Sequence, residues 1–533
     1  MTAAAPTTVP VGLLRRLDWR FLLPRPPSGR FDRLVLLGAG DDLAGAAAAA
    51  GLARSVATAL PAGGTVDAVA VLAGADPPAA RVAAALAPGG VVYWENDRRR
   101  PGCRRRTPAR VAAALAAAGL APAGRFAVRP GLARPELYLP VDEPGPFRWY
   151  ASSVYVAARP VQRLGEAAVR AVTGLDGRRL AAIAPFHAVV AVHGERPGPA
   201  VAERAAGATG PVALVNHGGN RVVLFAFEGA APATVVKVPE QPAFAARTVR
   251  EQEVMREVRA ALGPAADAVP EPAGLADVGL GVPAAVEAGA PGRTMARSSG
   301  RWGRPLARRV EDLTAAAAWL ERLHVDARVA DGRWDAHARR TWLDGPVARF
   351  AERFGTTAAE DRLFAATAAR AAALDGAPLP VVWQHGDYTV WNLVRDRDRL
   401  RVLDWEGARP GLPLCDLDRF ATHWHELATG ARTERDRQAA LAALFLDPDA
   451  GARAPATAAA RDALDRHRRA VGVPAGLAPV LLVAAWVELC VRRSDQQRDG
   501  GAAPAGARAG NPNLPYLATL AGGCGRLFPE VSR

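Results

Sequence analysis

Short apolar runs alternate with alanine-rich segments through residues 31–95, and this alternation limits how the first part of the chain can fold. The run Phe31–Leu37 ends in the glycine turn Gly38–Gly40 and is followed by an alanine-rich stretch. A second apolar run covers Val66–Leu72, and a third follows the turn Pro88–Gly90. Strands that alternate with helices pair in parallel, because each crossover helix returns the chain to the same edge. We therefore expect an α/β domain with a parallel sheet.

The pattern changes to hairpins from Val212 onward. Two apolar runs, Val212–Asn216 and Val222–Phe227, flank the tight-turn sequence His217–Asn220. A third strand is expected at Thr234–Val238, and a helix at Ala245–Leu262. Three antiparallel strands followed by a helix resemble the N-lobe of an α+β bilobal protein-kinase-like fold.

These patterns divide the chain into four parts. We expect the α/β domain at 1–145, a connecting segment at 146–205 with a helix over 161–173, an N-lobe at 206–290 and a C-lobe at 291–533 that ends in a helical region. Helices are expected near 456–471 and 477–492. A chain of 533 residues is long enough for two or three such cores.

The net charge of +14 does not predict a nucleic-acid partner. The arginines are spread along the whole chain beside acidic residues, which is typical of a solvated surface. The densest cluster, Arg98–Arg100 with Arg104–Arg106, lacks the interleaved aromatic residues of a single-strand-binding surface. We expect no nucleic-acid partner and predict no specific protein partner.

The four cysteines and the apolar runs indicate in which cellular compartment the protein is expected. The cysteines contain no CxxC pair, which favours a reducing compartment over a disulfide framework. The N-terminus has no basic stretch followed by an apolar core, and the run Gly476–Trp486 is too short to span a bilayer. We expect a cytoplasmic protein without a membrane span.

Lys237 is the only lysine among 67 basic residues, all the others being arginine. A lysine kept where arginine is so favoured indicates a site that needs a compact ammonium group. In kinases a strand lysine contacts the α- and β-phosphates and is held by a helix glutamate. Glu251, Val254, Met255 and Val258 follow helical spacing on one apolar face, which favours Glu251 as that partner and leaves Glu253 in reserve.

Two segments, Val382–Val394 and Val402–Glu406, carry the other residues expected of a phosphoryl-transfer site. Asp387 is suited to be the general base for an acceptor hydroxyl. Asn392 offers a neutral oxygen and Asp404 an anionic one, the ligands that Mg²⁺ prefers. His385 is expected to brace the loop and not to transfer protons. The role of Glu406 stays open.

The ordered set His385-Gly-Asp387-x4-Asn392, then Leu403-Asp404-Trp-Glu406, resembles the aminoglycoside phosphotransferase and choline kinase family. The resemblance covers about residues 206–500 and includes the following further segments: Leu320–His324, the hinge-like Val286–Arg293 and Gly411–Leu417. It implies ATP and Mg²⁺ as cofactors, cofactor contacts by Lys237, Glu251 and Glu287, metal ligation by Asn392 and Asp404, and a loop-bracing Asp416. It also implies that the late helices form the acceptor pocket.

Residues 30–140 resemble class I methyltransferases, a Rossmann-like family, in the glycine turn after the first strand, in Asp67 and in the sequence Leu86–Gly90. In that family an acidic residue ending the second strand holds the ribose of the cofactor. The expected second strand, Ala53–Leu60, carries no acid. We therefore expect a degenerate, cofactor-free domain.

The sequence thus predicts an ATP-dependent phosphotransferase that acts on a hydroxyl of a small molecule, a sugar or a glycan intermediate. Two alternatives remain: a bifunctional protein with an active S-adenosylmethionine-dependent methyltransferase domain, and a pseudokinase scaffold. Nearby aromatic and imidazole groups are interpreted as packing or pocket-wall residues: Trp383, Trp391, Trp405, His423 and His425.

Overall fold

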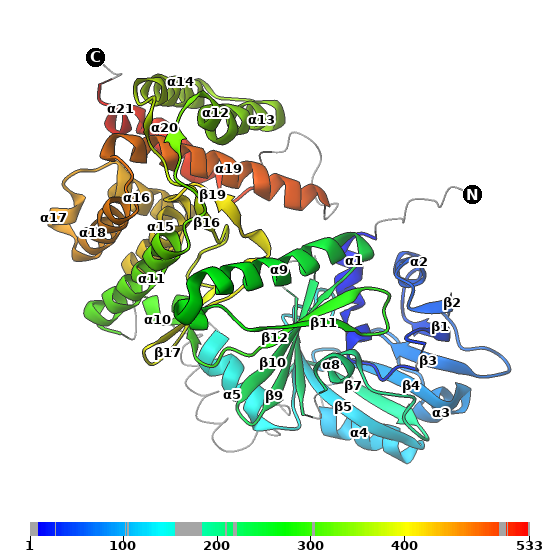
Figure 1. Cartoon of the computed structure of the whole chain (residues 1–533). Helices are drawn as coiled ribbons and strands as arrows, with labels where there is room; N and C mark the ends of the chain where they lie inside the picture. The colour runs from blue at the N-terminus through cyan, green and yellow to red at the C-terminus, as the bar shows by residue number, and fades with distance from the viewer. Residues whose placement is uncertain are drawn as a thin grey trace. The chain divides into compact units, whose positions relative to one another are not determined.

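The computed structural model (Figure 1) describes residues 9–26, 28–101, 103, 106–154, 184–207, 210–216, 221–300, 304–499, 508 and 510–530. The chain forms two compact units. Unit 1 comprises residues 1–252 and 271–291, and unit 2 comprises 253–270 and 292–533. The helix predicted at 161–173 and the turn 217–220 lie outside the described residues.

Unit 1 begins with a parallel sheet in the order β2-β1-β3-β4. The strands are β1 (Phe31–Leu37), β2 (Ala53–Ala57), β3 (Val66–Val71) and β4 (Leu86–Asp97). Alternate side chains point to opposite faces of a strand. Leu34 and Leu36 accordingly pack with the helices α1 (Val11–Arg16) and α2 (Asp41–Ala49), while Val35 packs with α3 (Ala79–Ala85) and α4 (Pro108–Ala117). The parallel pairing predicted from the alternation is therefore present.

The sheet of unit 1 continues without a break into the antiparallel strands predicted for the N-lobe. Its twelve strands follow the order β11-β12-β10-β9-β8-β6-β5-β7-β4-β3-β1-β2. The remaining strands are β5 (Leu120–Arg129), β6 (Leu137–Pro140), β7 (Phe186–His193), β8 (Val212–Val215), β9 (Arg221–Glu228), β10 (Ala231–Pro239), β11 (Pro272–Asp277) and β12 (Pro283–Ala288). The junction is the antiparallel pair β6–β8, where Leu137 faces Val215 and Tyr138 faces Leu214. The expected boundaries at 145 and 206 do not interrupt this sheet.

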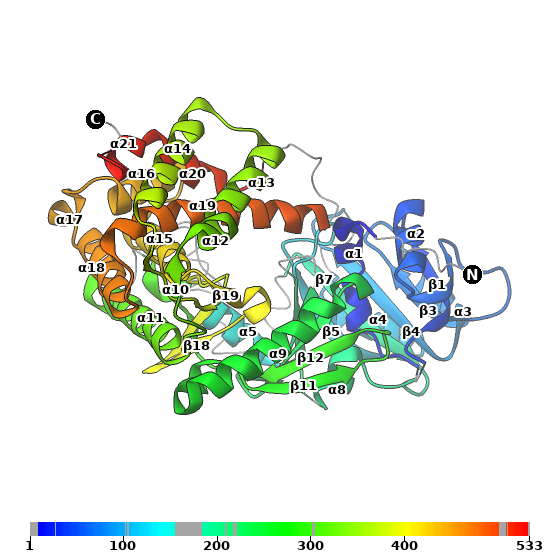
Figure 2. The ribbon, with the colours of Figure 1, turned by 45° about the horizontal axis from the view of Figure 1, so that its top comes forward.

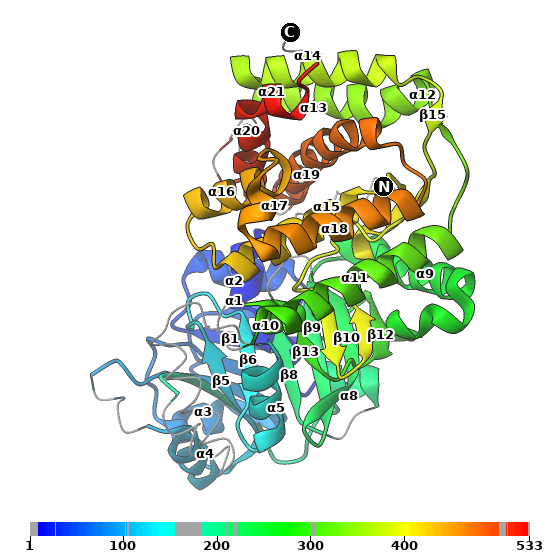
Figure 3. The same cartoon turned by 90° about the vertical axis from the view of Figure 1, so that its left-hand side faces the viewer.

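Unit 2 is mainly helical, and Figures 2 and 3 show its helices from two further directions. Its longer helices are α11 (Leu306–Asp326), α13 (Gly345–Phe354), α14 (Ala358–Ala373), α15 (Cys415–Thr429), α16 (Glu434–Phe445), α18 (Pro455–Ala470), α19 (Ala478–Asp499) and α20 (Leu514–Gly522). Two short antiparallel strand pairs flank the loops between residues 385 and 408. They are β16 (Val382–Gln384) with β19 (Arg409–Gly411), and the hairpin of β17 (Leu393–Asp396) and β18 (Arg399–Val402).

The helix α19 lies in the core of unit 2. Its apolar residues pack in a cluster with Trp334, Phe350, Leu363 and Leu517. The stretch Ala475–Gln496 is long and apolar enough to cross a membrane by length and composition, and 61% of its most apolar window is buried inside the protein. Burial of this kind is equally typical of a core helix in a globular protein.

Candidate active site

Lys237 lies near the end of β10, in the antiparallel half of the unit 1 sheet. It pairs with Val223 of β9 and with Ala285 of β12, so neighbouring strands flank it on both sides. Only 4% of the residue is exposed. A buried ammonium needs charged partners, because removing it from water costs several kcal/mol (on the order of 5) unless those partners compensate.

Two carboxylates supply that compensation. Lys237 Nζ lies 2.6 Å from Glu251 Oε1 and 2.9 Å from Glu287 Oε1. Arg221 Nη1 contacts the other oxygen of Glu251 at 2.5 Å. The group therefore combines two cations with two carboxylates. Burial raises the pKa of Glu287, the charge of Lys237 opposes that rise, and the charge of Glu251 adds to it.

Glu251 is the helix partner that the apolar periodicity favoured, and its contact with Lys237 is confirmed. It lies on α9 (Ala245–Leu262), where Glu253 and Glu257 are exposed. Glu287 was expected to contact the cofactor, and the structure shows it in contact with Lys237 from β12, a pairing that was not predicted. Arg221 was also missed, because it begins a strand and no local pattern connects it to a residue 30 positions away.

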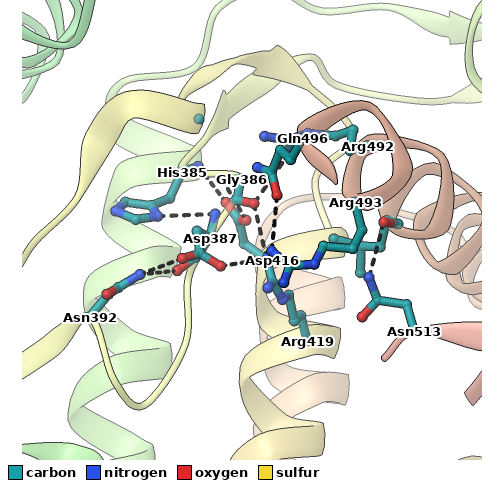
Figure 4. A network of polar contacts seen from close by, with 12 residues as sticks. His385, Gly386, Asp387, Asn392, Asp416, Arg419, Arg492, Arg493, Gln496 and Asn513 are labelled. Carbon is teal, nitrogen blue, oxygen red and sulfur yellow. Dashed lines mark hydrogen bonds and ion pairs between the residues drawn. The ribbon is translucent and has the colours of Figure 1, made fainter. Parts of the chain in front are cut away.

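The loop after β16 carries His385, Gly386 and Asp387 (Figure 4). His385 Nε2 lies 2.9 Å from the carbonyl oxygen of Leu403, and its Nδ1 accepts a hydrogen bond from the backbone N–H of Asp387 at 3.2 Å. An Nδ1 that accepts implies that the ring proton resides on Nε2. His385 thus ties the loop to the segment that carries Asp404, as its predicted bracing role requires.

Asp416, at the start of α15, fixes the same loop from the other side. Its two carboxylate oxygens accept hydrogen bonds from the backbone N–H groups of His385 at 2.5 Å and of Gly386 at 3.0 Å. Burial raises the pKa of Asp416, while His385 and these two N–H groups lower it. Gly386 has φ +77°, and a Cβ atom there would lie 2.5 Å from the carbonyl oxygen of Gly407. Only glycine fits this position.

Both oxygens of the Asp387 carboxylate have partners in unit 2. Asn392 Nδ2 donates to Oδ2 at 2.7 Å and to the backbone oxygen of the same residue at 2.9 Å. Arg419 Nη1 lies 2.7 Å from Oδ1. The side chain of Asp387 is nevertheless 40% exposed, so a substrate hydroxyl can reach it.

Asn392 and Asp404 are brought together by the hairpin of β17 and β18. The backbone N–H of Leu403 donates to the backbone carbonyl oxygen of Asn392 at 2.8 Å, and Leu393 of β17 pairs with Val402 of β18. Asp404 has φ +69°, a left-handed conformation that turns the chain directly after β18. Since Asn392 donates through Nδ2, its amide oxygen Oδ1 is left to accept or to bind a cation.

These two oxygen donors fit a magnesium ion. Within the described ranges, no group of three or more His, Cys, Asp and Glu side chains is arranged to hold a metal. Mg²⁺ is commonly held by one or two protein oxygens together with waters and substrate phosphates, so it needs no such cluster. Asn392 and Asp404 are therefore a sufficient protein contribution.

Two arginines next to the loop were not predicted. Arg419 lies one helical turn after Asp416 on α15, and its Nη1 also donates to the Gly386 oxygen at 3.1 Å. Arg492 reaches the same oxygen from α19 at 3.4 Å. The position of Arg419, three residues after the motif residue Asp416, was an available signal. No local sequence signal pointed to Arg492, since it lies 106 positions from its partner Gly386.

The aromatic and imidazole residues differ in their surroundings. Trp405 is fully buried and donates to the oxygen of Val402, as expected for packing. Trp391 is 52% exposed, so the packing role expected of it does not extend to burial in the core. Burial lowers the pKa of His423 to about 3 and that of His425 to about 4. Both are therefore neutral near pH 7, and His425 lies 2.8 Å from Thr457 Oγ1.

The carboxyl ends of the parallel strands carry a separate polar group. Glu95, near the end of β4, accepts from both terminal nitrogens of Arg16, from the N–H of Ala73 at 2.8 Å and from the hydroxyl of Tyr93 at 3.1 Å. Cofactors of open α/β sheets bind at this edge of the sheet. In this protein Arg16, from helix α1, forms an ion pair with Glu95 at that edge.

Comparison with known proteins bears on the second half of the chain. Residues 213–456 match the model of the phosphotransferase enzyme family. No curated protein matches the sequence. The methyltransferase resemblance of residues 30–140 stays a prediction, because the family match begins at residue 213.

Several solved structures are similar at low identity. The macrolide 2'-phosphotransferase MphH from Brachybacterium faecium is 19% identical, with 56% of this chain and 89% of that chain covered and a TM-score of 0.36. A thermostable mutant of aminoglycoside phosphotransferase APH(4)-Ia is 14% identical, with 62% and 98% covered and a TM-score of 0.40. A choline/ethanolamine kinase family protein from Mesorhizobium loti is 17% identical, with 52% and 94% covered and a TM-score of 0.29.

These TM-scores lie below 0.5, so the family match and the geometry of the loop carry the assignment. The matched segment contains Lys237, Asp387, Asn392 and Asp404. Residues 213–456 therefore form a domain of the phosphotransferase enzyme family.

Proposed function

We propose that the protein is an ATP-dependent phosphotransferase that transfers the γ-phosphoryl group to a hydroxyl of a small molecule, a sugar or a glycan intermediate. The observation that carries this proposal is the fixed loop of Asp387 and Asn392 within the matched segment. Phosphoryl transfer depends mainly on positioning and on charge stabilisation. His385 and Asp416 hold the loop backbone in place through four hydrogen bonds of their side chains.

In the proposed reaction, Asp387 orients the acceptor hydroxyl and takes its proton. The acceptor oxygen forms a bond to the γ-phosphorus, the bond from that phosphorus to the bridging oxygen breaks, and ADP leaves with the electron pair. Lys237, held by Glu251 and Glu287, binds the non-transferred phosphates. Asn392 and Asp404 would hold Mg²⁺, which supplies positive charge to the phosphate oxygens when bound.

The N-terminal half is proposed to be cofactor-free. Arg16 is paired with Glu95 at the edge of the sheet where a cofactor would bind. The strand β2 ends at Ala57 without an acidic residue that could hold a ribose. The proposed location is the cytoplasm.

ADP formation with a panel of hydroxyl compounds tests the proposed function. We expect ADP to appear with at least one acceptor, and Asp387→Asn to lower turnover by ~10²–10⁴-fold while ATP still binds. Near-normal turnover in that variant would show that Asp387 is not the base. Failure of the unmodified protein to bind ATP with Mg²⁺ would favour a pseudokinase scaffold instead.

A further inference from the structure

The side of the catalytic loop that faces α15 and α19 is unusually rich in arginine. A small cavity there, of about 40 Å³, is lined by three arginines and two carboxylates, together with Gly386 and apolar residues. The charged residues are Arg409, Arg419, Arg492, Asp416 and Glu488. On the same measure a single water molecule needs about 10–15 Å³, so the cavity has room for a small group of atoms.

The two carboxylates of the cavity are already engaged. Asp416 accepts from the backbone of the catalytic loop, as described above. Glu488 lies 3.3 Å from Arg409 Nη2 and 3.5 Å from Arg349 Nη2, so it is shared between two arginines. No carboxylate of the cavity therefore remains for Arg419 or Arg492.

Arg492 carries the clearest sign of uncompensated positive charge. Its guanidinium is directed at the backbone of Gly386, where its one hydrogen bond to a described residue is the 3.4 Å contact with the Gly386 oxygen. Burial and then the charge of Arg409 lower the pKa of Arg492 to about 10, although Glu488 and Asp416 oppose the fall. The positive potential of the three arginines thus exceeds what the nearby carboxylates neutralise.

Arg419 connects this charge to the reaction. Its counter-ion is Asp387, and both of its contacts, with Asp387 Oδ1 and with the Gly386 oxygen, use Nη1. In the described part of the chain, its Nη2 and Nε make no other hydrogen bond, so they remain available as donors. When Asp387 takes the proton of the acceptor hydroxyl, Arg419 loses its counter-charge. A negative group on the acceptor would then be bound more tightly as the reaction proceeds, which accelerates the chemical step.

We propose that the acceptor is an anionic hydroxyl compound whose carboxylate or phosphate binds Arg419 and Arg492 beside Asp387. This inference rests on the proposed function, and it names the substrate class. The anionic group occupies the small arginine-lined cavity, while the rest of the acceptor stays outside with its hydroxyl at Asp387. Cationic acceptors such as amino sugars are disfavoured, because the same arginines repel them.

Four sugars of one ring type separate the possibilities: glucose, glucosamine, glucuronate and glucose 6-phosphate. ADP formation gives kcat/KM for each, and thermal shift without ATP gives binding independently of turnover. We expect glucuronate or glucose 6-phosphate to exceed glucose by ~10-fold or more, equivalent to about 1.4 kcal/mol, and glucosamine to be the poorest. The glucuronate and glucose 6-phosphate arms distinguish a carboxylate from a phosphate.

Substitutions of the arginines test whether the preference for an anionic sugar arises in this cavity. Arg492→Gln should abolish the advantage of the anionic sugar by raising its KM relative to the KM for glucose measured with the same variant. Arg409→Gln is a second variant in the same cavity that leaves the contacts of Gly386 intact. Arg493→Gln is the matched control, since this neighbouring arginine is exposed and contacts Gln496 at 3.5 Å.

The outcomes separate the two proposals. Equal or better use of glucosamine or glucose would overturn the anionic acceptor and still support the phosphotransferase. Absence of both turnover and thermal stabilisation with both anionic sugars would also overturn it, even where ATP binds. Failure to bind ATP with Mg²⁺ or to form ADP with any acceptor would instead reject the proposed function.

Discussion

The guanidinium of Arg419 and the carboxylate of Asp387 form an ion pair, with Nη1 2.7 Å from Oδ1. Arg419 projects from α15, whose first turn also carries Asp416, the residue that holds the backbone of the loop. One helix therefore fixes both the backbone and the side chain of the proposed catalytic segment. The orientation of Asp387 depends on α15 as much as on its own loop.

Replacement of Arg419 tests that dependence. Arg419→Gln should lower kcat by ~10–100-fold, because among the described residues Asp387 then keeps only Asn392 as a side-chain partner and its carboxylate can rotate. Arg419→Lys should recover part of the loss, since an ammonium restores the charge without the planar geometry. Steady-state kinetics with the acceptor found in the screen measures both. Unchanged kcat in Arg419→Gln would remove Arg419 from the site.

Lys237→Arg should weaken ATP binding even though the charge is kept. The ammonium fits between Glu251 and Glu287 at 2.6 and 2.9 Å in a buried space, and a guanidinium is larger and planar. We expect the KM for ATP to rise by ~10-fold or more, because a hydrogen bond to a charged group contributes about 1.5–3 kcal/mol. Titration with ATP measures this, and Glu253→Gln on the exposed face of α9 is the control. Wild-type ATP affinity in Lys237→Arg would indicate that the single lysine is not functionally selected.

Asp418 makes stability depend on pH. Burial raises the pKa of its carboxyl to about 8. Between roughly pH 4 and pH 8 the folded protein keeps the proton that the unfolded chain releases, so this contribution to stability is complete below pH 4 and declines as the pH rises to about 8.

Asp418→Asn should remove that decline, because an amide stays neutral throughout. Relative to the unmodified protein, the variant should gain on the order of 4 kcal/mol of unfolding free energy between pH 5 and pH 9. Thermal denaturation at a series of pH values measures the gain. Asp462→Asn, an exposed position on α18, should show no such trend. A constant difference in Tm across the pH range would contradict the raised pKa.

The full-length chain should not bind S-adenosylmethionine. Arg16 and the backbone of Ala73 already engage Glu95 at the carboxyl edge of the parallel strands. Calorimetric titration should give no heat at concentrations up to about 1 mM, a limit that corresponds to a binding free energy near −4 kcal/mol. Saturable binding at micromolar concentration would show that the N-terminal half is a working methyltransferase-like domain.

The sequence predicted what depends on local periodicity and spacing. Glu251 followed from the apolar face of one helix, and the parallel strands followed from the alternation of apolar runs. The partners that it missed are distant in sequence: Arg221 joins Glu251 across 30 positions and Arg492 joins Gly386 across 106. The continuity of the sheet was missed for the same reason. The pairing of β6 with β8 spans a long connection, and neither strand carries a local signal for its partner.

The pairing of β6 with β8 also decides how the two halves of unit 1 can exist. The main-chain groups on one side of β8 are hydrogen-bonded to β6, and those on the other side to β9. A fragment that begins at residue 206 would leave the outer side of β8 unpaired, and an exposed strand edge invites association with other chains. In the intact chain the N-terminal half supplies the strand β6 that pairs with this side of β8. Separation of the two halves would expose a strand edge on each fragment, at β6 on one and at β8 on the other.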